Sequence, residues 1–179
     1  AVSSPGPTAP SIRVVPRVDE WETAGWNAKI CPGACHDWHS LSDGRMLLVA
    51  ATNYGNHSGN RSLVEAARVA FRSHASQSYD AGELLTRVNQ TLCSASPGGE
   101  GLSLAVALLD EEGAHASVAL AGTSGTLRWR ASSCEAIPAA SAPAGLSERT
   151  VYVPRRLEVL VRERLVLMAT SDKLTTSTS

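Results

Sequence analysis

The spacing of apolar residues along this chain changes from strand-like to helical and back again, and this pattern constrains the fold most. Two segments, 62–74 and 80–94, repeat their apolar residues with helical spacing, whereas the chain around them alternates or runs continuously apolar, as strands do. Consecutive strands favour antiparallel pairing, and no regular strand–helix alternation points to a doubly wound sheet. We therefore predict an α+β fold with two antiparallel sheets packed face to face and both helices on an outer face.

The individual elements follow from local signals. Ser62 with Glu65, and Asp80 with Glu83, are capping boxes that mark the two helix starts. An Asp43-Gly44 turn is expected between a strand at 24–31 and its antiparallel partner Arg45–Thr52, while 132–146, rich in Ala, Pro and Ser, is expected to be an irregular loop. Further strands are expected at 102–109, 115–121, 126–131, 151–153, 157–161 and 165–169.

Composition limits the class of protein. With 179 residues, 43% of them hydrophobic, the chain can form one domain with a sizeable core. The net charge of −1 offers no basic surface for nucleic acid or membrane, and no apolar run has the length of a transmembrane helix. Four scattered cysteines favour a reduced, cytoplasmic protein. We expect a linker or disordered arm at 1–22, one domain at 23–175 and a tail at 176–179.

The segment 31–59 concentrates the candidate site residues. Cys31, Cys35 and His39 have a C-x3-C-x3-H spacing that could supply three zinc ligands, although it is not a common zinc-finger spacing. The alternative, which we favour, is that the cysteines are small buried residues. His57, in a Gly/Asn/Ser loop before the first helix, could bind an anion together with backbone amides, or simply face solvent.

Three motifs carry a family resemblance. Residues 32–45 read P-G-A-C-H-D-W-H-S-L-S-D-G-R, residues 51–57 read A-T-N-Y-G-N-H, and residues 165–175 read L-V-L-M-A-T-S-D-K-L-T. Over about 23–175 the chain resembles the SpoIIE-type branch of the metal-dependent (PPM, protein phosphatase 2C-like) serine/threonine phosphatases. That family reads G-G-D-x-x-D then D-G-R, G-D-V-S-G-H-G, and L-L-L-Y-T-D-G-L-T-E. The resemblance implies a PPM-type α-β-β-α layered sandwich.

The same resemblance implies positions for a two-metal centre. Ala34 and Thr52 stand where the family has metal-binding aspartates, and Asp37 matches a second, usually non-ligating aspartate. The third position falls on Thr170 without a gap, or on Asp172 with one extra residue. Hard divalent cations need carboxylate oxygens, which Ala34 and Thr52 lack.

A positive charge and the end of the chain also affect this centre. Lys173 replaces the glycine beside the third position, and the sequence stops before the family's final metal-binding aspartate, so the C-terminal part of the family domain could be absent.

The leading hypothesis is thus a degenerate, catalytically inactive phosphatase-like domain, without a cofactor, that regulates bacterial signalling by binding a protein. The suggested partners are an anti-sigma-factor antagonist, another signalling domain or a second copy of the chain. The alternatives are an active Mg²⁺- or Mn²⁺-dependent phosphoserine/phosphothreonine phosphatase and, more weakly, a zinc module at Cys31–His39.

Overall fold

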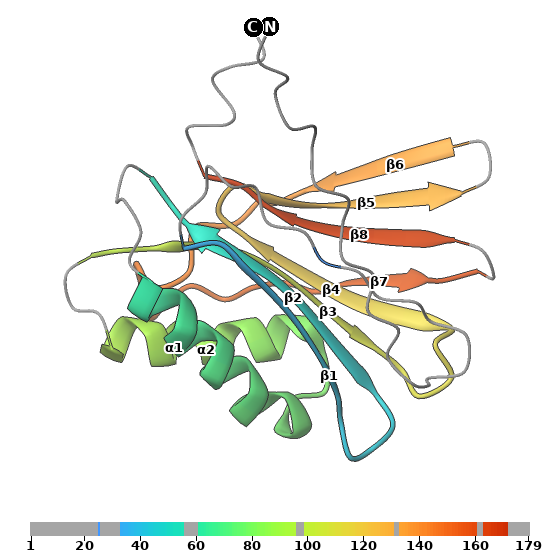
Figure 1. The fold of residues 1–179 in the computed structure, drawn as a ribbon, viewed down its shortest axis with the longest axis horizontal. Helices are drawn as coiled ribbons and strands as arrows, with labels where there is room; N and C mark the ends of the chain where they lie inside the picture. Colours follow the sequence, from blue (N-terminus) through green and yellow to red (C-terminus); the bar gives the residue numbers. More distant parts are fainter. Residues whose placement is uncertain are drawn as a thin grey trace, which may run out of the picture.

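A computed structural model shows two antiparallel sheets packed face to face, with a helix pair on one side (Figure 1). The α+β class and the two-sheet sandwich predicted from the sequence are confirmed. The structure describes residues 25, 33–55, 61–95, 99–130, 133–160 and 163–171.

The larger sheet has five strands in the order β1-β2-β3-β4-β7, and every neighbouring pair is antiparallel. β3 lies at its centre and is buried along its whole length, which explains its uninterrupted apolar sequence. The strands are β1 (Cys35–Ser40), β2 (Met46–Asn53), β3 (Leu102–Leu109), β4 (His115–Ala121) and β7 (Arg155–Glu158).

The smaller sheet has three strands in the order β6-β5-β8. The chain enters it at Gly122, whose φ of 67° suits glycine and whose Cβ, if added, would lie 2.8 Å from Ser103 Oγ. Gly122 therefore allows the turn between β4 and β5 to pass close to β3. The strands are β5 (Ser124–Arg130), β6 (Ser133–Pro138) and β8 (Arg164–Ala169).

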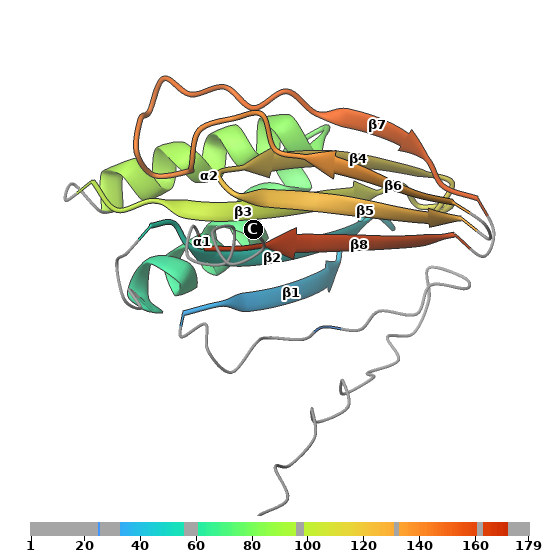
Figure 2. The same cartoon turned by 90° about the horizontal axis from the view of Figure 1, so that it is seen from above.

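Two helices, α1 (Arg61–His74) and α2 (Ala81–Ala95), cover the outer face of the five-stranded sheet, joined by the short η1 (Ala75–Gln77) (Figures 1 and 2). The predicted cap of α2 is confirmed, because Asp80 Oδ1 accepts the Glu83 N–H at 2.9 Å. The predicted start of α1 is wrong by one residue: the helix begins at Arg61, so Ser62 lies inside the helix instead of before it.

Strand alternation divides the core into two layers. Leu102, Leu104, Val106 and Leu108 of β3 pack toward the helices, while the residues between them, from Ala105 to Leu109, face the smaller sheet. Both layers share the same central strand, so the sandwich and the helix layer are built on one element.

One sequence prediction for the first half of the chain needs correction. The Cys/His-rich stretch expected to be a loop contains β1, which pairs with β2 across a tight turn in which Leu41 N–H donates to Arg45 O at 2.8 Å and Gly44 has φ 85°. The polar residues of this stretch misled the prediction because an edge strand tolerates them. The strand expected at 24–31 lies outside the described residues except for Gly25.

Two further differences lie in the second half. The expected loop 132–146 contains β6, because alternate residues of a solvent-facing edge strand need not be apolar. The segment 151–153 is not a strand: the Tyr152 N–H donates to Thr86 Oγ1 of α2 at 3.1 Å instead of to a neighbouring strand. β7 accordingly begins only at Arg155.

Candidate functional site

The implied metal positions meet at one end of the sandwich. The last β1–β2 pair is Cys35 with Ala51, so one further step of the same register sets Ala34 opposite Thr52. Thr52 in turn pairs directly with Ser103 of β3. Directly opposite residues share a sheet face, and the alternation along β3 turns Ser103 and Thr52 toward the smaller sheet.

A hydroxyl network joins this point to the third implied position. The Thr170 N–H and Oγ1 both donate to Thr123 O, at 3.1 and 2.5 Å, and Thr123 Oγ1 donates to Thr170 O. Ser103 Oγ lies 2.9 Å from Thr123 Oγ1 and accepts the Thr123 N–H at 3.2 Å. Because Thr123 uses its hydroxyl proton on Thr170, Ser103 is the donor between the two hydroxyls.

Thr52, Ser103, Thr123 and Thr170 form a hydroxyl cluster, and all four of its side chains are neutral. Ser103 is fully buried and Thr52 is 3% exposed. The described residues contain no group of three or more His, Cys, Asp or Glu side chains that could hold a metal ion. Two divalent cations require several carboxylate oxygens, so the side chains described here do not fit them. Asp172, the one carboxylate that the resemblance suggests for the third position, lies outside the described residues.

Asp37 belongs to the opposite face of the sheet. It pairs with Val49, which packs in the core under the helices, and both of its oxygens accept hydrogen bonds from Arg72 of α1 at 2.9 Å. This two-bond ion pair ties β1 to α1. Asp37 therefore serves the helix layer and does not approach the hydroxyl cluster.

The described zinc candidates do not converge. Cys35 and His39 lie four residues apart on one extended strand, which separates them by about 13 Å. Burial, followed by the charges of Glu65 and Asp37, raises the pKa of the Cys35 thiol to about 11, so it stays protonated at neutral pH. Cys31 and His57 lie outside the described residues.

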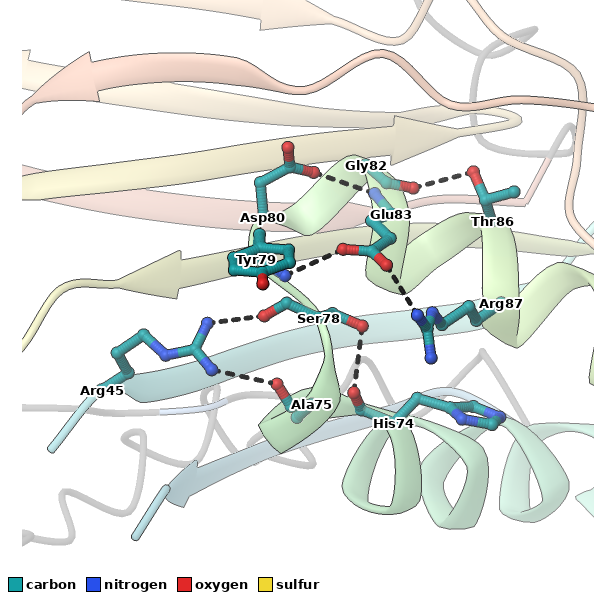
Figure 3. Close-up of polar contacts among 10 residues, drawn as sticks. All are labelled: Arg45, His74, Ala75, Ser78, Tyr79, Asp80, Gly82, Glu83, Thr86 and Arg87. Carbon is teal, nitrogen blue, oxygen red and sulfur yellow. Dashed lines mark hydrogen bonds and ion pairs between the residues drawn. The ribbon is translucent and has the colours of Figure 1, made fainter. Parts of the chain in front are cut away.

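The Asp-Gly-Arg motif has a structural role that the sequence did not suggest. Arg45 donates to Ser78 O at 2.7 Å and to Ala75 O at 3.3 Å, which fixes the β1–β2 hairpin to the α1–α2 connection (Figure 3). A side-chain hydrogen bond from Arg45 also lowers the pKa of Asp43. The motif thus holds the helix pair in place on the sheet.

Sequence reasoning missed Ser103 and Thr123. Both are polar residues at places where the pattern predicts an apolar strand and a solvent-facing turn. The usable signal was Ser103 itself, a lone hydroxyl in the otherwise apolar run of β3, since a buried polar side chain needs a partner.

Solved structures define the class of this fold. The RsbU and RsbW domains of a Mycobacterium tuberculosis protein match with TM-score 0.63 and 22% identity, over 76% of this chain and 39% of that one. A bacterial serine phosphatase matches with TM-score 0.64 and 15% identity, over 76% and 68%. RsbX in complex with magnesium matches with TM-score 0.61 and 14% identity, over 76% and 65%. The fold is that of the PP2C-type phosphatases, and the chain spans from about two fifths to two thirds of these neighbours.

The sequence assigns the chain within that class. Residues 42–172 match the family Stage II sporulation protein E (SpoIIE), and the chain belongs to this family. No curated protein matches it in sequence. Neither helix in the described part of the chain is long and apolar enough to cross a lipid bilayer.

Proposed function

We propose that this SpoIIE-type domain is a pseudophosphatase that regulates bacterial signalling by binding a protein partner. The observation that carries the proposal is the chemistry at the implied metal positions. The side chain of Ala34 supplies no ligand atom there, Thr52 supplies a neutral hydroxyl, and Thr170 is hydrogen-bonded through both its N–H and its hydroxyl to Thr123.

The physical argument is one of charge. Each missing carboxylate removes a full negative charge from a centre that must hold two dications, and Mg²⁺ loses its hydration water reluctantly. Without the metals, no hydroxide forms near neutral pH and the charge of the phosphoryl group stays uncompensated. No step of hydrolysis is therefore assigned to this chain.

The partner is proposed from the family. The fold of this chain is similar to that of RsbU and RsbW domains and of RsbX, so a phosphorylated anti-sigma-factor antagonist or another signalling domain in the bacterial cytoplasm is the favoured partner. In this proposal the domain binds such a protein without dephosphorylating it. A homodimer is the second possibility for its assembly.

The competing hypothesis is an active metal-dependent phosphoserine/phosphothreonine phosphatase. RsbX has been crystallised with magnesium on a similar fold, which keeps this hypothesis open for a chain whose Asp172 is not described. In that case Asp172 would supply a carboxylate and Thr52 a weak ligand.

A turnover assay separates the two hypotheses. We expect no measurable hydrolysis of an aryl phosphate or a phosphoserine peptide with Mn²⁺ present, either by the wild type or by the Thr52→Ala, Asp172→Ala double variant. Metal-dependent turnover by the wild type that the double variant lacks would establish the active phosphatase. The double variant is the matched control because it removes both remaining candidate ligands, and its circular dichroism spectrum should match that of the wild type.

A further inference from the structure

The segment that leads into β7 combines a fixed backbone with exposed apolar side chains. Val151 is 72% exposed and Val153 is 81% exposed, whereas Tyr152 between them is 2% exposed. This alternation is that of an extended chain with one face packed and the other open. Figure 2 shows the segment along the outer rim of the molecule, beside α2. Residues 151–153 are called the Val151–Val153 edge.

Tyr152 fixes this edge to α2. Its N–H donates to Thr86 Oγ1 at 3.1 Å, and its hydroxyl donates to Ala142 O at 3.2 Å. Its carbonyl oxygen lies against Gly82, where a Cβ would be only 2.4 Å away. The edge is therefore held in an extended shape before any partner arrives, which lowers the entropy cost of binding.

The same contacts determine where the remaining backbone groups point. In an extended chain, the N–H and C=O of one residue point to one side and those of its neighbours point to the other. Both groups of Tyr152 point toward α2, so those of Val151 and Val153 point away from it. No hydrogen bond between described residues uses these groups of the two valines. They are thus available to pair with another extended chain, as the groups of an edge strand are.

Arginines flank the edge on both sides. Arg149 precedes it, Arg155 and Arg156 follow it, and all three are exposed. None of them takes part in an ion pair between described residues. The nearest acidic residues in the sequence, Glu148 and Glu158, lie outside this stretch, so the stretch carries positive charge only. These charges favour a partner with acidic residues on both sides of its paired segment.

The arginines also argue against a second copy of the chain as the occupant. Antiparallel pairing of two copies about Tyr152 would set Val151 of one copy opposite Val153 of the other. Two residues further along, Arg149 of one copy would then lie opposite Arg155 of the other. Like charges directly opposite each other destabilise a strand pair, and charged residues commonly prevent self-pairing of edges. Acidic residues in the incoming chain turn this repulsion into attraction.

We propose that the Val151–Val153 edge binds an extended segment of a partner protein by strand addition, a segment with β-branched apolar residues at its centre and acidic residues at its ends. Its backbone pairs with that of Val151 and Val153. Its carboxylates pair with Arg149 and Arg155. A helix cannot take its place, because the backbone groups of a helix are already bonded along its length. This inference rests on the protein-binding role proposed above and names the surface and the kind of partner.

The test titrates synthetic peptides into the full chain. The probe has about seven residues, with valines at alternate central positions and a glutamate at each end. One control peptide has lysines in place of the glutamates. Two others carry backbone N-methyl groups on alternate residues, one at the odd and one at the even positions, so that each removes the N–H groups of one side only. The readout is the NMR signals and the hydrogen exchange of the Val151 and Val153 amides.

We expect saturable shifts and slower exchange of both amides with the glutamate-ended peptide. One N-methyl pattern should abolish binding and the other should leave it intact, because only one side of the peptide faces the edge. Arg155→Glu should weaken binding of the glutamate-ended peptide about tenfold and favour the lysine-ended one. Arg164→Glu, the same change at an exposed arginine of β8, should leave the affinity unchanged.

The apolar contribution has its own pair of variants. Val153→Ala should weaken binding about threefold or more, because its methyl groups pack against the peptide. Val69→Ala, which removes an exposed valine side chain from α1, should leave the affinity unchanged. Equal effects of the two variants would overturn the placement of the peptide on this edge.

Other outcomes contradict the proposal in distinct ways. Absence of saturation, or equal affinity for the glutamate-ended and lysine-ended peptides, overturns it. So do equal effects of the two N-methyl patterns, because strand addition uses the N–H groups of one side. Slow exchange of both amides without peptide also overturns it: if the protection grows with protein concentration a second copy occupies the edge, and otherwise the chain's own residues do. Phosphatase turnover alongside peptide binding would overturn the pseudophosphatase proposal alone.

Discussion

Glu163 is the most deeply enclosed ion-pair partner among the described residues. Its side chain is 2% exposed, and it accepts hydrogen bonds from Arg128 Nε and from the Leu160 N–H, the latter at 3.0 Å. Burial by itself would raise the pKa of Glu163, but these hydrogen bonds outweigh it and the pKa is lowered. One carboxylate thus joins the turn before β8 to β5.

Replacement of Glu163 should therefore be costly. Glu163→Gln leaves Arg128 without its nearest charge partner, and we expect a loss of about 2 kcal/mol in the free energy of unfolding, measured with urea. Glu135→Gln is the matched control, since Glu135 is exposed and lies 3.8 Å from the same arginine. Its effect should stay below about 0.5 kcal/mol. Equal effects of the two variants would contradict the role of Glu163.

The same carboxylate makes a prediction about pH. A pKa that is lower in the folded than in the unfolded chain stabilises the fold above the unfolded value of about 4.3, and that stabilisation is lost as pH falls through the lower folded value. The free energy of unfolding of the wild type, measured with urea, should therefore fall with acidification in this window more steeply than that of Glu163→Gln. Parallel pH profiles would show that Glu163 has no lowered pKa in the fold.

At the scale of elements, the packing of α2 depends on the close approach of another backbone segment to Gly82. A Cβ at Gly82 would lie 2.4 Å from Tyr152 O and 2.5 Å from Pro154 Cδ. The segment before β7 therefore packs directly on the first turn of α2, and the Tyr152 N–H donates to Thr86 Oγ1 in the next turn. A helix position that ordinarily favours alanine must here be glycine.

Gly82→Ala should invert the usual effect of this substitution. In an open helix it gains about 1 kcal/mol, but here the overlap with backbone should cost about 2 kcal/mol of unfolding free energy. Ser94→Ala on the exposed side of α2 is the control and should change stability by less than about 0.5 kcal/mol. Thermal unfolding of both variants decides, and a stabilised Gly82→Ala would contradict the close packing.

The elements that the sequence predicted well are those whose apolar residues follow one clear strand or helix spacing. β3, β4 and α2 lie within about a residue of their predicted bounds because their apolar residues repeat clearly. β1 and β6 were missed because edge strands need no apolar alternation. The hydroxyl cluster could not be predicted, since Ser103, Thr123 and Thr170 are brought together only when β8 packs over the turn between β4 and β5.

At the scale of the whole molecule, the chain has a SpoIIE-type sandwich, and the described side chains at the implied metal positions, Ala34, Thr52 and Thr170, are neutral. The motifs that the chain keeps have structural roles: Asp37 holds α1, and Arg45 holds the α1–α2 connection. The aspartates that the family resemblance implies for metal binding are replaced by Ala34 and Thr52. This division is what we expect of a domain that keeps the fold for binding and has lost turnover.

Calorimetric titration of Mn²⁺ into the full chain tests this account most directly. We predict no saturable binding by the wild type up to about millimolar metal, because neutral oxygens do not replace carboxylates around a hard dication. Ala34→Asp with Thr52→Asp, which adds one carboxylate just before β1 and one on β2, should gain measurable affinity. Two Mn²⁺ ions bound tightly by the wild type, and lost from Thr52→Ala with Asp172→Ala, would contradict the central claim.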